Sequence, residues 1–372
     1  MDCAIEKLPL TGKHTAYLKT DLHDDFLKRL ISRLHSLSKP WVIAFEDMKS
    51  LQDFVSLDSP QDLCLFPPFD LLPFEQVEGS IPTLKNRMKT LYRLGSFERF
   101  NGGILTTIPT LLQKIVDPRL LVTSSLTFKK GGYITGDGRP RYDRESVIQH
   151  LTESGYRRVY TVENLGEFSA RGFILDFFSL LDDFPTRIEF FDDEVSDVRF
   201  FDPQTQLSLP RGVDSTEGCQ RQEGERLIPP FRETFFKEEN LECFRNRIAD
   251  LKKRYPNSLF LGTLEQKPDR FPTLGGMLLP TQRALVNLLP KDTVFFYVRL
   301  SQALERFRAY EKELFDIYPQ AEYKEIYLKY LRVSESALLS RENVTVLTES
   351  RGPSVSLGDQ AALFADYTVS SD

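Results

Sequence analysis

The first third of the chain alternates between short apolar runs and segments whose apolar residues have helical spacing. Apolar side chains recur every three or four positions over residues 21–37, which predicts an amphipathic helix. Residues 41–45 (WVIAF) are all apolar and suit a strand that is buried on both faces, as in a parallel sheet. The pattern then predicts helices over residues 48–55 and 81–94 and strands over 63–66 and 103–108. Strands that alternate with helices predict an α/β layer with parallel crossovers.

The middle of the chain changes its periodicity near Pro118. A predicted helix over residues 144–153 is followed by strand-like alternation over 167–178, 187–191 and 195–201. This succession predicts a twisted antiparallel meander. The acidic residues Asp192, Asp193 and Glu194 lie between two aromatic-rich strands, where a hairpin turn is favoured. The polar loop 210–222 would end this domain.

The last part of the chain returns to mixed patterns. We expect a helix over residues 231–255, strands over 258–261 and 293–298, and charged helices over 301–331. From Ser340 the sequence alternates weakly, and no apolar closing element is predicted there. The expected domains are residues 1–117 and 210–300 as two parts of one α/β scaffold, 118–209 as a β-rich insert, and 301–372 as a helical connection.

Composition restricts the class of protein. The 372 residues carry a formal net charge of -6 and are 41% hydrophobic, as in water-soluble globular chains. There is neither an apolar run of the roughly 20 residues that cross a bilayer nor a signal-peptide core, so a cytoplasmic location is expected. The four cysteines are scattered and the histidines lack ligand spacing, so neither a disulfide frame nor a metal site is expected.

Thr11, Gly12 and Lys13 resemble the end of a phosphate-binding loop. Such a loop requires an earlier glycine and a hydroxyl residue after the lysine, and Lys7 and His14 occupy those positions. We therefore expect a degenerate loop, no catalytic residues and no cofactor. A cryptic nucleotide hydrolase, with Lys13 and the acids at 192–194, is kept as an alternative.

A basic cluster lies on both sides of the glycines at positions 131 and 132. Its members are Lys129, Lys130, Arg139, Arg141 and Arg144. Because local charge decides nucleic-acid affinity, a DNA-binding scaffold module is a second alternative, although the acidic net charge weighs against it.

Arginines and phenylalanines are combined in the predicted meander. The candidate contact residues are Arg157, Arg158, Arg171, Phe177 and Phe178. Neighbours on a strand point to opposite faces, so one phenylalanine is expected in the core and the other is exposed unless a second layer covers it. Exposed aromatic rings among arginines have the composition of an interface hot spot, yet a solvated sheet edge accounts for these residues equally well.

A resemblance to a known family decides between these interpretations. The segments FPPFDLLPFEQV (66–77), RMKTLYRL (87–94) and GGILTTIPTLLQKI (102–115) occur in this order. GYRRV, GEFSARGFILDFF and RIEFFDDEVSDVRFFD follow between residues 155 and 202. Together they resemble the N-terminal, UvrB-like module of the transcription-repair coupling factors (Mfd), whose insert is the UvrA-binding domain shared with UvrB.

The resemblance implies a degenerate helicase-like (P-loop-type) parallel-sheet scaffold that is interrupted by a β-rich α+β UvrB-interaction domain. Contacts to UvrA would fall on Arg157 or Arg158, on Arg171, and on Phe177 or Phe178. The implied function is non-catalytic: recruitment of UvrA to lesion-stalled RNA polymerase in transcription-coupled nucleotide-excision repair. In this family RNA polymerase and double-stranded DNA bind other domains, which also contain the ATP-dependent motor, and a C-terminal domain masks the UvrA-binding face.

Overall fold

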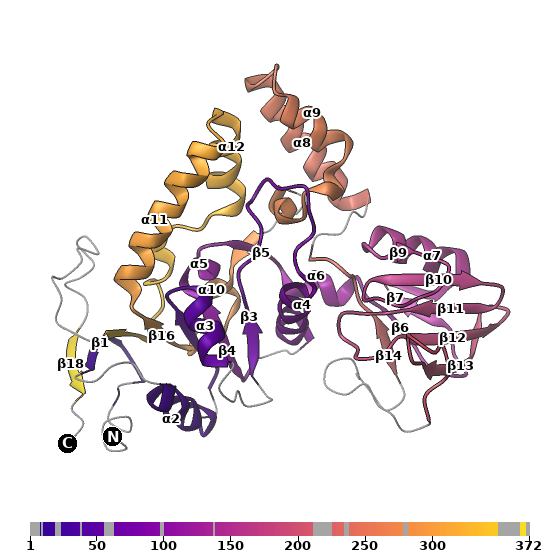
Figure 1. Ribbon diagram of the computed structural model, residues 1–372, viewed down its shortest axis with the longest axis horizontal. Coiled ribbons are helices and arrows are strands. Elements are labelled where there is room, and N and C mark those ends of the chain that lie inside the picture. Colours follow the sequence, from indigo (N-terminus) through magenta and orange to yellow (C-terminus); the bar gives the residue numbers. More distant parts are fainter. Residues whose placement is uncertain are drawn as a thin grey trace. The chain divides into compact units, whose positions relative to one another are not determined.

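The computed structural model describes residues 8, 10–18, 24–37, 39–55, 63–96, 100–136, 138–210, 225–233, 238–277, 282–348 and 365–369. The chain forms two compact units (Figure 1). Unit 1 comprises Met1–Leu72, Arg99–Ile115 and Gln282–Asp372, and unit 2 comprises Pro73–Glu98 and Val116–Thr281. These limits do not coincide with the domain boundaries expected from the sequence, which remain predictions. The expected loop at 210–222 lies, apart from Pro210, outside the described residues.

Unit 1 is built on a seven-stranded sheet with the order β18-β1-β17-β16-β2-β4-β3. Every neighbouring pair in this sheet is parallel. Its strands are β1 (Lys13–Leu18), β2 (Trp41–Phe45), β3 (Cys64–Phe66), β4 (Gly103–Thr107), β16 (Val294–Val298), β17 (Val344–Thr348) and β18 (Ala365–Val369). The predicted α/β layer with parallel crossovers is thus confirmed, because all five residues of β2 are buried as a central parallel strand requires.

Helices of unit 1 supply the apolar residues that cover this sheet. Side chains of α2, such as Leu30 and Leu34, and of α3, such as Leu51, share one core with Ile43 of β2. Gly103 pairs with Trp41, and a Cβ atom at this glycine would overlap the indole ring. The helices are α2 (Asp24–His35), α3 (Met48–Val55), α5 (Ile108–Leu111), α10 (Leu285–Leu288), α11 (Leu300–Ile317) and α12 (Ala321–Ile326), then the π-helix η3 (Tyr327–Leu331) and the 3-10 helix η4 (Glu335–Ala337). A small sheet pairs β5 (Lys114–Val116) with β15 (Gln282–Ala284).

Unit 2 contains a four-stranded and a five-stranded sheet. The first has the order β14-β6-β7-β8, and the second has the order β13-β12-β11-β10-β9. The four strands are β6 (Leu126–Phe128), β7 (Ile134–Gly136), β8 (Arg139–Tyr142) and β14 (Arg226–Ile228). The five are β9 (Arg157–Arg158), β10 (Glu167–Arg171), β11 (Ile174–Phe177), β12 (Thr186–Phe191) and β13 (Glu194–Phe200). The helices are α4 (Ile81–Ser96), α6 (Pro118–Thr123), α7 (Arg144–Glu153), α8 (Glu238–Arg254) and α9 (Leu259–Gln266), with 3-10 helices η1 (Pro268–Arg270) and η2 (Pro272–Met277).

Three sequence-based element assignments are wrong. The predicted strand over 258–261 is the start of helix α9, which Ser258 caps by accepting a hydrogen bond from the Leu261 amide at 3.2 Å. The predicted strand over 167–178 is a hairpin, because Gly172 adopts a φ of +53° and reverses the chain between β10 and β11. The C-terminal part does contain an apolar closing element, since β17 inserts between β1 and β16 with four buried residues.

No helix in the described ranges combines the length and the apolar character needed to span a membrane. Within the same ranges, His, Cys, Asp and Glu side chains nowhere gather in groups of three or more that could bind a metal ion.

Candidate partner-binding site

The five-stranded sheet of unit 2 has one apolar face and one polar face. Cross-strand pairing aligns Phe168 with Phe177, and Leu175 with Ile188, and these four side chains are buried. The intervening residues point to the other side of the sheet. Ser169, Asp176, Arg187 and Arg199 form one row there, and Arg171, Ile174, Glu189 and Asp197 form the next. We call this second side the polar face.

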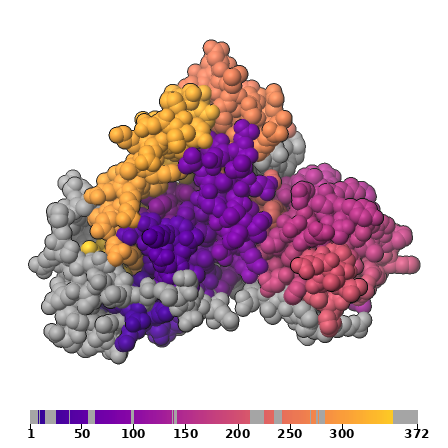
Figure 2. Space-filling model, in the orientation of Figure 1, coloured from indigo at the N-terminus to yellow at the C-terminus, as the bar shows by residue number. Residues whose placement is uncertain are grey.

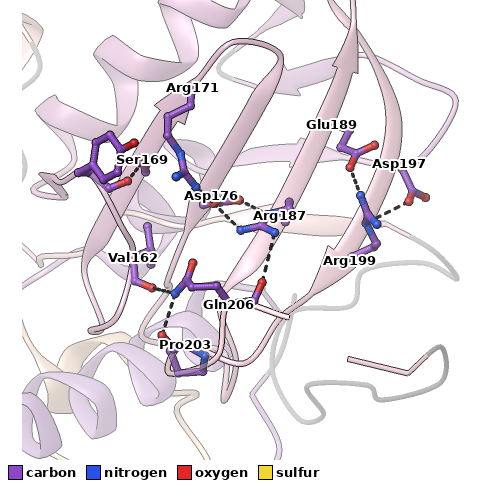
Figure 3. Close-up of polar contacts among 11 residues, drawn as sticks. Val162, Ser169, Arg171, Asp176, Arg187, Glu189, Asp197, Arg199, Pro203 and Gln206 are labelled. Atoms are coloured by element: carbon purple, nitrogen blue, oxygen red, sulfur yellow. Dashed lines mark hydrogen bonds and ion pairs between the residues drawn. The ribbon is translucent and has the colours of Figure 1, made fainter. Parts of the chain in front are cut away.

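A buried carboxylate binds two arginines on the polar face (Figure 3). Arg187 donates to Asp176 from Nε at 2.8 Å and from Nη2 at 2.9 Å. Arg171 donates to the same carboxylate at 3.3 Å. Asp176 is fully buried, whereas the Arg171 side chain is 40% exposed. Two guanidinium groups against one carboxylate leave one uncompensated positive charge, and it lies toward solvent at Arg171.

A second ion network lies further across the same face. Arg199 contacts Glu189 and, at 3.3 Å from its Nε, Asp197, so that β12 and β13 are joined by charge as well as by the backbone ladder (Figure 3). All three side chains are part-exposed. Pairs of this kind contribute up to about 1 kcal/mol each, so their main effect is to fix side-chain positions.

One end of the polar face is covered by a small apolar cluster. Phe178, Val162 and Phe201 form it, with Val159 and Leu165 packed against it. Arg187 stacks on the Phe201 ring, with its Cζ atom 4.5 Å from the ring centroid. The cluster therefore closes this end of the face and leaves the end near Arg171 open.

Glu167 holds the loop that carries part of this cluster. Its carboxylate accepts hydrogen bonds from the amides of Glu163 and Asn164, each at 2.9 Å, and from Arg157 at 2.5 Å. Burial raises the pKa of Glu167, but these hydrogen bonds to the charged form outweigh it and leave the pKa lowered.

We expect this lowered pKa to make unit 2 sensitive to acid. A carboxylate whose pKa is lower in the folded than in the unfolded state stabilises the fold above the unfolded value, about 4.3 for Glu. That stabilisation is lost as the pH falls through the folded-state value. Glu167→Gln should therefore lower stability at neutral pH and reduce its dependence on pH below about 4.3. The urea midpoints of variant and wild type, measured from neutral pH to below about pH 4.3, give both effects. Parallel pH profiles for the two proteins would contradict the stabilising role of the Glu167 carboxylate.

Exposed aromatic rings lie at the open end. Tyr160 is 81% exposed, and the Cζ of Arg171 lies 5.4 Å from the centroid of its ring. Phe191 is 78% exposed and follows the buried Phe190 on β12, so its ring points to the side of Arg187 and Glu189. Figure 2 shows the magenta segments that hold these strands as a continuous surface at the right of the view. The open end thus combines a cation with exposed aromatic surface.

The predicted contact residues have different positions in the structure. Arg171 lies at the open end, and Arg157 and Arg158 are exposed on the edge strand β9, where Arg157 pairs with Glu167. Phe177 and Phe178, 1% and 8% exposed, are both buried, because a second layer covers Phe178, which is the exception that the sequence analysis allowed. Phe177 packs with Phe128 and Tyr156, and the small apolar cluster covers Phe178.

The basic cluster predicted for DNA binding is largely paired with acids. Lys130 contacts Asp197, Arg141 contacts Asp193, and Arg144 contacts Glu145. Lys129 is exposed, and the side chain of Arg139 lies outside the described residues. These pairs leave little net positive charge for a nucleic-acid backbone.

The two motifs that resemble a nucleotide site lie in other structural contexts. Asp192 and Asp193 form a two-residue hairpin turn between β12 and β13, as predicted, and Asp192 has a φ of +59°. Thr11 and Gly12 precede strand β1, and the Lys13 ammonium donates to the Leu339 carbonyl at 2.7 Å. A phosphate loop instead lies between a strand and the helix that follows it.

Sequence reasoning missed four residues of the polar face and its open end. Asp176, Arg187, Tyr160 and Phe191 were not singled out as contact residues. Strict alternation along β12 would have placed Arg187 and Phe191 on one side of the sheet. No local signal marks Asp176, because its arginine partners come from neighbouring strands.

Part of this chain matches known proteins in sequence. Residues 138–215 match the family model of the UvrB interaction domain. The chain is similar to the transcription-repair-coupling factors of Haemophilus influenzae (34% identity over 151 residues, 41% of this chain) and Escherichia coli (30% over 173 residues, 46%). It is also 33% identical over 154 residues to the one from Myxococcus xanthus. These matches span only 12–14% of the relatives' length. They confirm the resemblance to the transcription-repair coupling factors and to the UvrB interaction domain.

Proposed function

We propose that the open end of the polar face binds UvrA. The observation that carries this proposal is the position of Arg171, whose guanidinium is partly exposed although a buried carboxylate fixes it. Arg187 already neutralises that carboxylate, so Arg171 retains charge and donors for a partner. A guanidinium fork pairs bidentately with a carboxylate, and a lysine cannot reproduce this geometry.

Phe191 gives the same surface an apolar contact. Aromatic residues and arginines carry a large share of the binding energy in many interfaces. The partner's complementary surface would thus present a carboxylate to Arg171 and an apolar patch to Phe191 and Tyr160. The location of these residues within the matched UvrB interaction domain supports UvrA as that partner.

The proposed role of the whole chain is recruitment without catalysis. It would serve as a module of a transcription-repair coupling factor that brings UvrA to stalled RNA polymerase in transcription-coupled repair. The ATP-dependent motor, the contacts to RNA polymerase and to double-stranded DNA, and a C-terminal domain that masks this face would belong to other parts of such a factor. The position of Lys13 at the start of β1 supports the absence of nucleotide hydrolysis here.

Calorimetric titration of UvrA into the chain tests the proposal. Arg171→Ala should weaken binding by about 2 kcal/mol or more, roughly thirtyfold, because a central interface arginine is lost. Phe191→Ala should have an effect in the same range. The matched control is Arg119→Ala, which removes an exposed arginine of unit 2 that lies outside the five-stranded sheet.

Two results would contradict parts of the proposal. If Arg171→Ala and Arg119→Ala bind UvrA equally well, the binding surface lies elsewhere. If the folded wild-type chain does not bind UvrA, the recruitment role is wrong.

A further inference from the structure

A cavity of about 540 Å³ lies within unit 1, in a region that the proposed function does not use. Three separate segments line it: Lys114; Arg283, Ala284 and Asn287; and Arg332, Val333 and Ser334. Its volume is within the range of roughly 300–1,000 Å³ that is typical of small-molecule sites.

Backbone contacts fix the walls of this cavity. The Val333 amide donates to the Leu112 carbonyl at 2.7 Å, and Gln113 forms an antiparallel bridge with Arg332. The Lys114 ammonium donates to the Lys329 carbonyl at 2.5 Å. The walls of the cavity are therefore held in place by hydrogen bonds between segments that are distant in sequence, and not by a single loop.

The lining is basic. It contains two arginines and one lysine, and none of the seven lining residues is acidic. Arg332 is held by Glu311 and Glu335, so it contributes a fixed guanidinium whose charge these acids offset. Arg283 is exposed and forms no hydrogen bond or ion pair with the described part of the chain. Arg283, Lys114 and the exposed amide of Asn287 thus place hydrogen-bond donors in the lining of the same cavity.

We infer that this cavity binds an anion of the phosphate class. A phosphate group accepts several hydrogen bonds at once, and a guanidinium fork and an ammonium group are its usual protein partners. The cavity exceeds the size of a single phosphate, so the group would belong to a pyrophosphate or to a phosphate ester, free or within a nucleic-acid backbone.

Titration with inorganic pyrophosphate at constant ionic strength tests this inference, followed by a short DNA duplex. Wild type should bind pyrophosphate, and Arg283→Gln should weaken that binding at least about tenfold, because hydrogen bonds from a charged group are lost. Arg283 is exposed, so this variant should melt as the wild type does. The control is Lys49→Gln, which removes an exposed cation of unit 1 that does not line the cavity.

The outcomes separate the two sources of phosphate and can overturn the inference. Pyrophosphate binding without DNA binding indicates a small phosphate compound, whereas salt-dependent DNA binding that Arg283→Gln weakens indicates a nucleic-acid backbone. The inference is wrong if neither probe binds, or if Arg283→Gln binds both as tightly as Lys49→Gln does.

Discussion

Asp176→Ala should lower the free energy of unfolding by about 3–5 kcal/mol, because it leaves the largely buried Arg187 without its carboxylate. Arg187 forms both of its short hydrogen bonds to this one group, at 2.8 and 2.9 Å. The remaining charge would be desolvated without compensation, which costs more than the ion pair itself contributes. Urea-induced unfolding followed by circular dichroism measures the change.

Glu189→Ala is the matched control for Asp176→Ala. It removes a carboxylate from the same polar face, but both Glu189 and its partner Arg199 are part-exposed. Exposed pairs contribute about 0–1 kcal/mol, so the control should lose at most that amount. If both variants lose the same free energy of unfolding, the buried ion pair of Asp176 stabilises the fold no more than an exposed pair does.

The ion pair between Asp176 and Arg171 also bears on the proposed binding of UvrA. If Asp176 positions Arg171, then Asp176→Asn, where the variant remains folded, should weaken UvrA binding as well, because the guanidinium loses its anionic anchor.

Arg87→Ala should lower the free energy of unfolding by a comparable 3–5 kcal/mol, roughly, because it breaks an ion pair of unit 2 in which both side chains are buried. Arg87 on α4 is completely buried and bonds to both carboxylate oxygens of Glu233. Thermal melting and urea unfolding should both register the loss.

Two further variants make the Arg87 result interpretable. Lys85→Ala on the same helix removes a part-exposed pair with Asp183 and should cost about 1 kcal/mol or less. The double variant Arg87→Met with Glu233→Leu should be more stable than Arg87→Ala, since Glu233 is no longer left as a buried charge without Arg87. A double variant that is less stable than Arg87→Ala would show that hydrogen-bond geometry, rather than the unpaired charge, dominates.

Sequence reasoning succeeded where one element's own pattern decides its burial. Trp41–Phe45 has no polar residue and is a central parallel strand, and the expected helix 144–153 has the bounds of α7. It failed for β17, because Thr345 interrupts the apolar run like a solvent-facing residue, although it is buried in an interior strand of the parallel sheet. It failed again at Ser258, which caps a helix that was taken for a strand.

The candidate site was predictable only in part, because some of its contacts join segments that local sequence does not connect. Alternation correctly places Phe177 and Phe178 on opposite faces of β11 and its continuation. The cover over Phe178 comes from Val162 and Phe201, which local sequence does not connect with it. Arg171 was a candidate from the sequence pattern and the family resemblance favoured it as a contact residue, whereas Asp176 becomes significant only when β11 and β12 are paired.

The strand order of unit 1 also has a consequence for how the chain folds during synthesis. Strand β17, at residues 344–348, lies between β1 and β16, so β1 acquires this neighbour only after more than 320 further residues have been synthesised. The five-stranded sheet of unit 2, by contrast, pairs strands that are close in sequence, and short sequence separations between contacts favour rapid folding. The polar face can therefore form on the nascent chain before β17 joins the interior of the seven-stranded sheet.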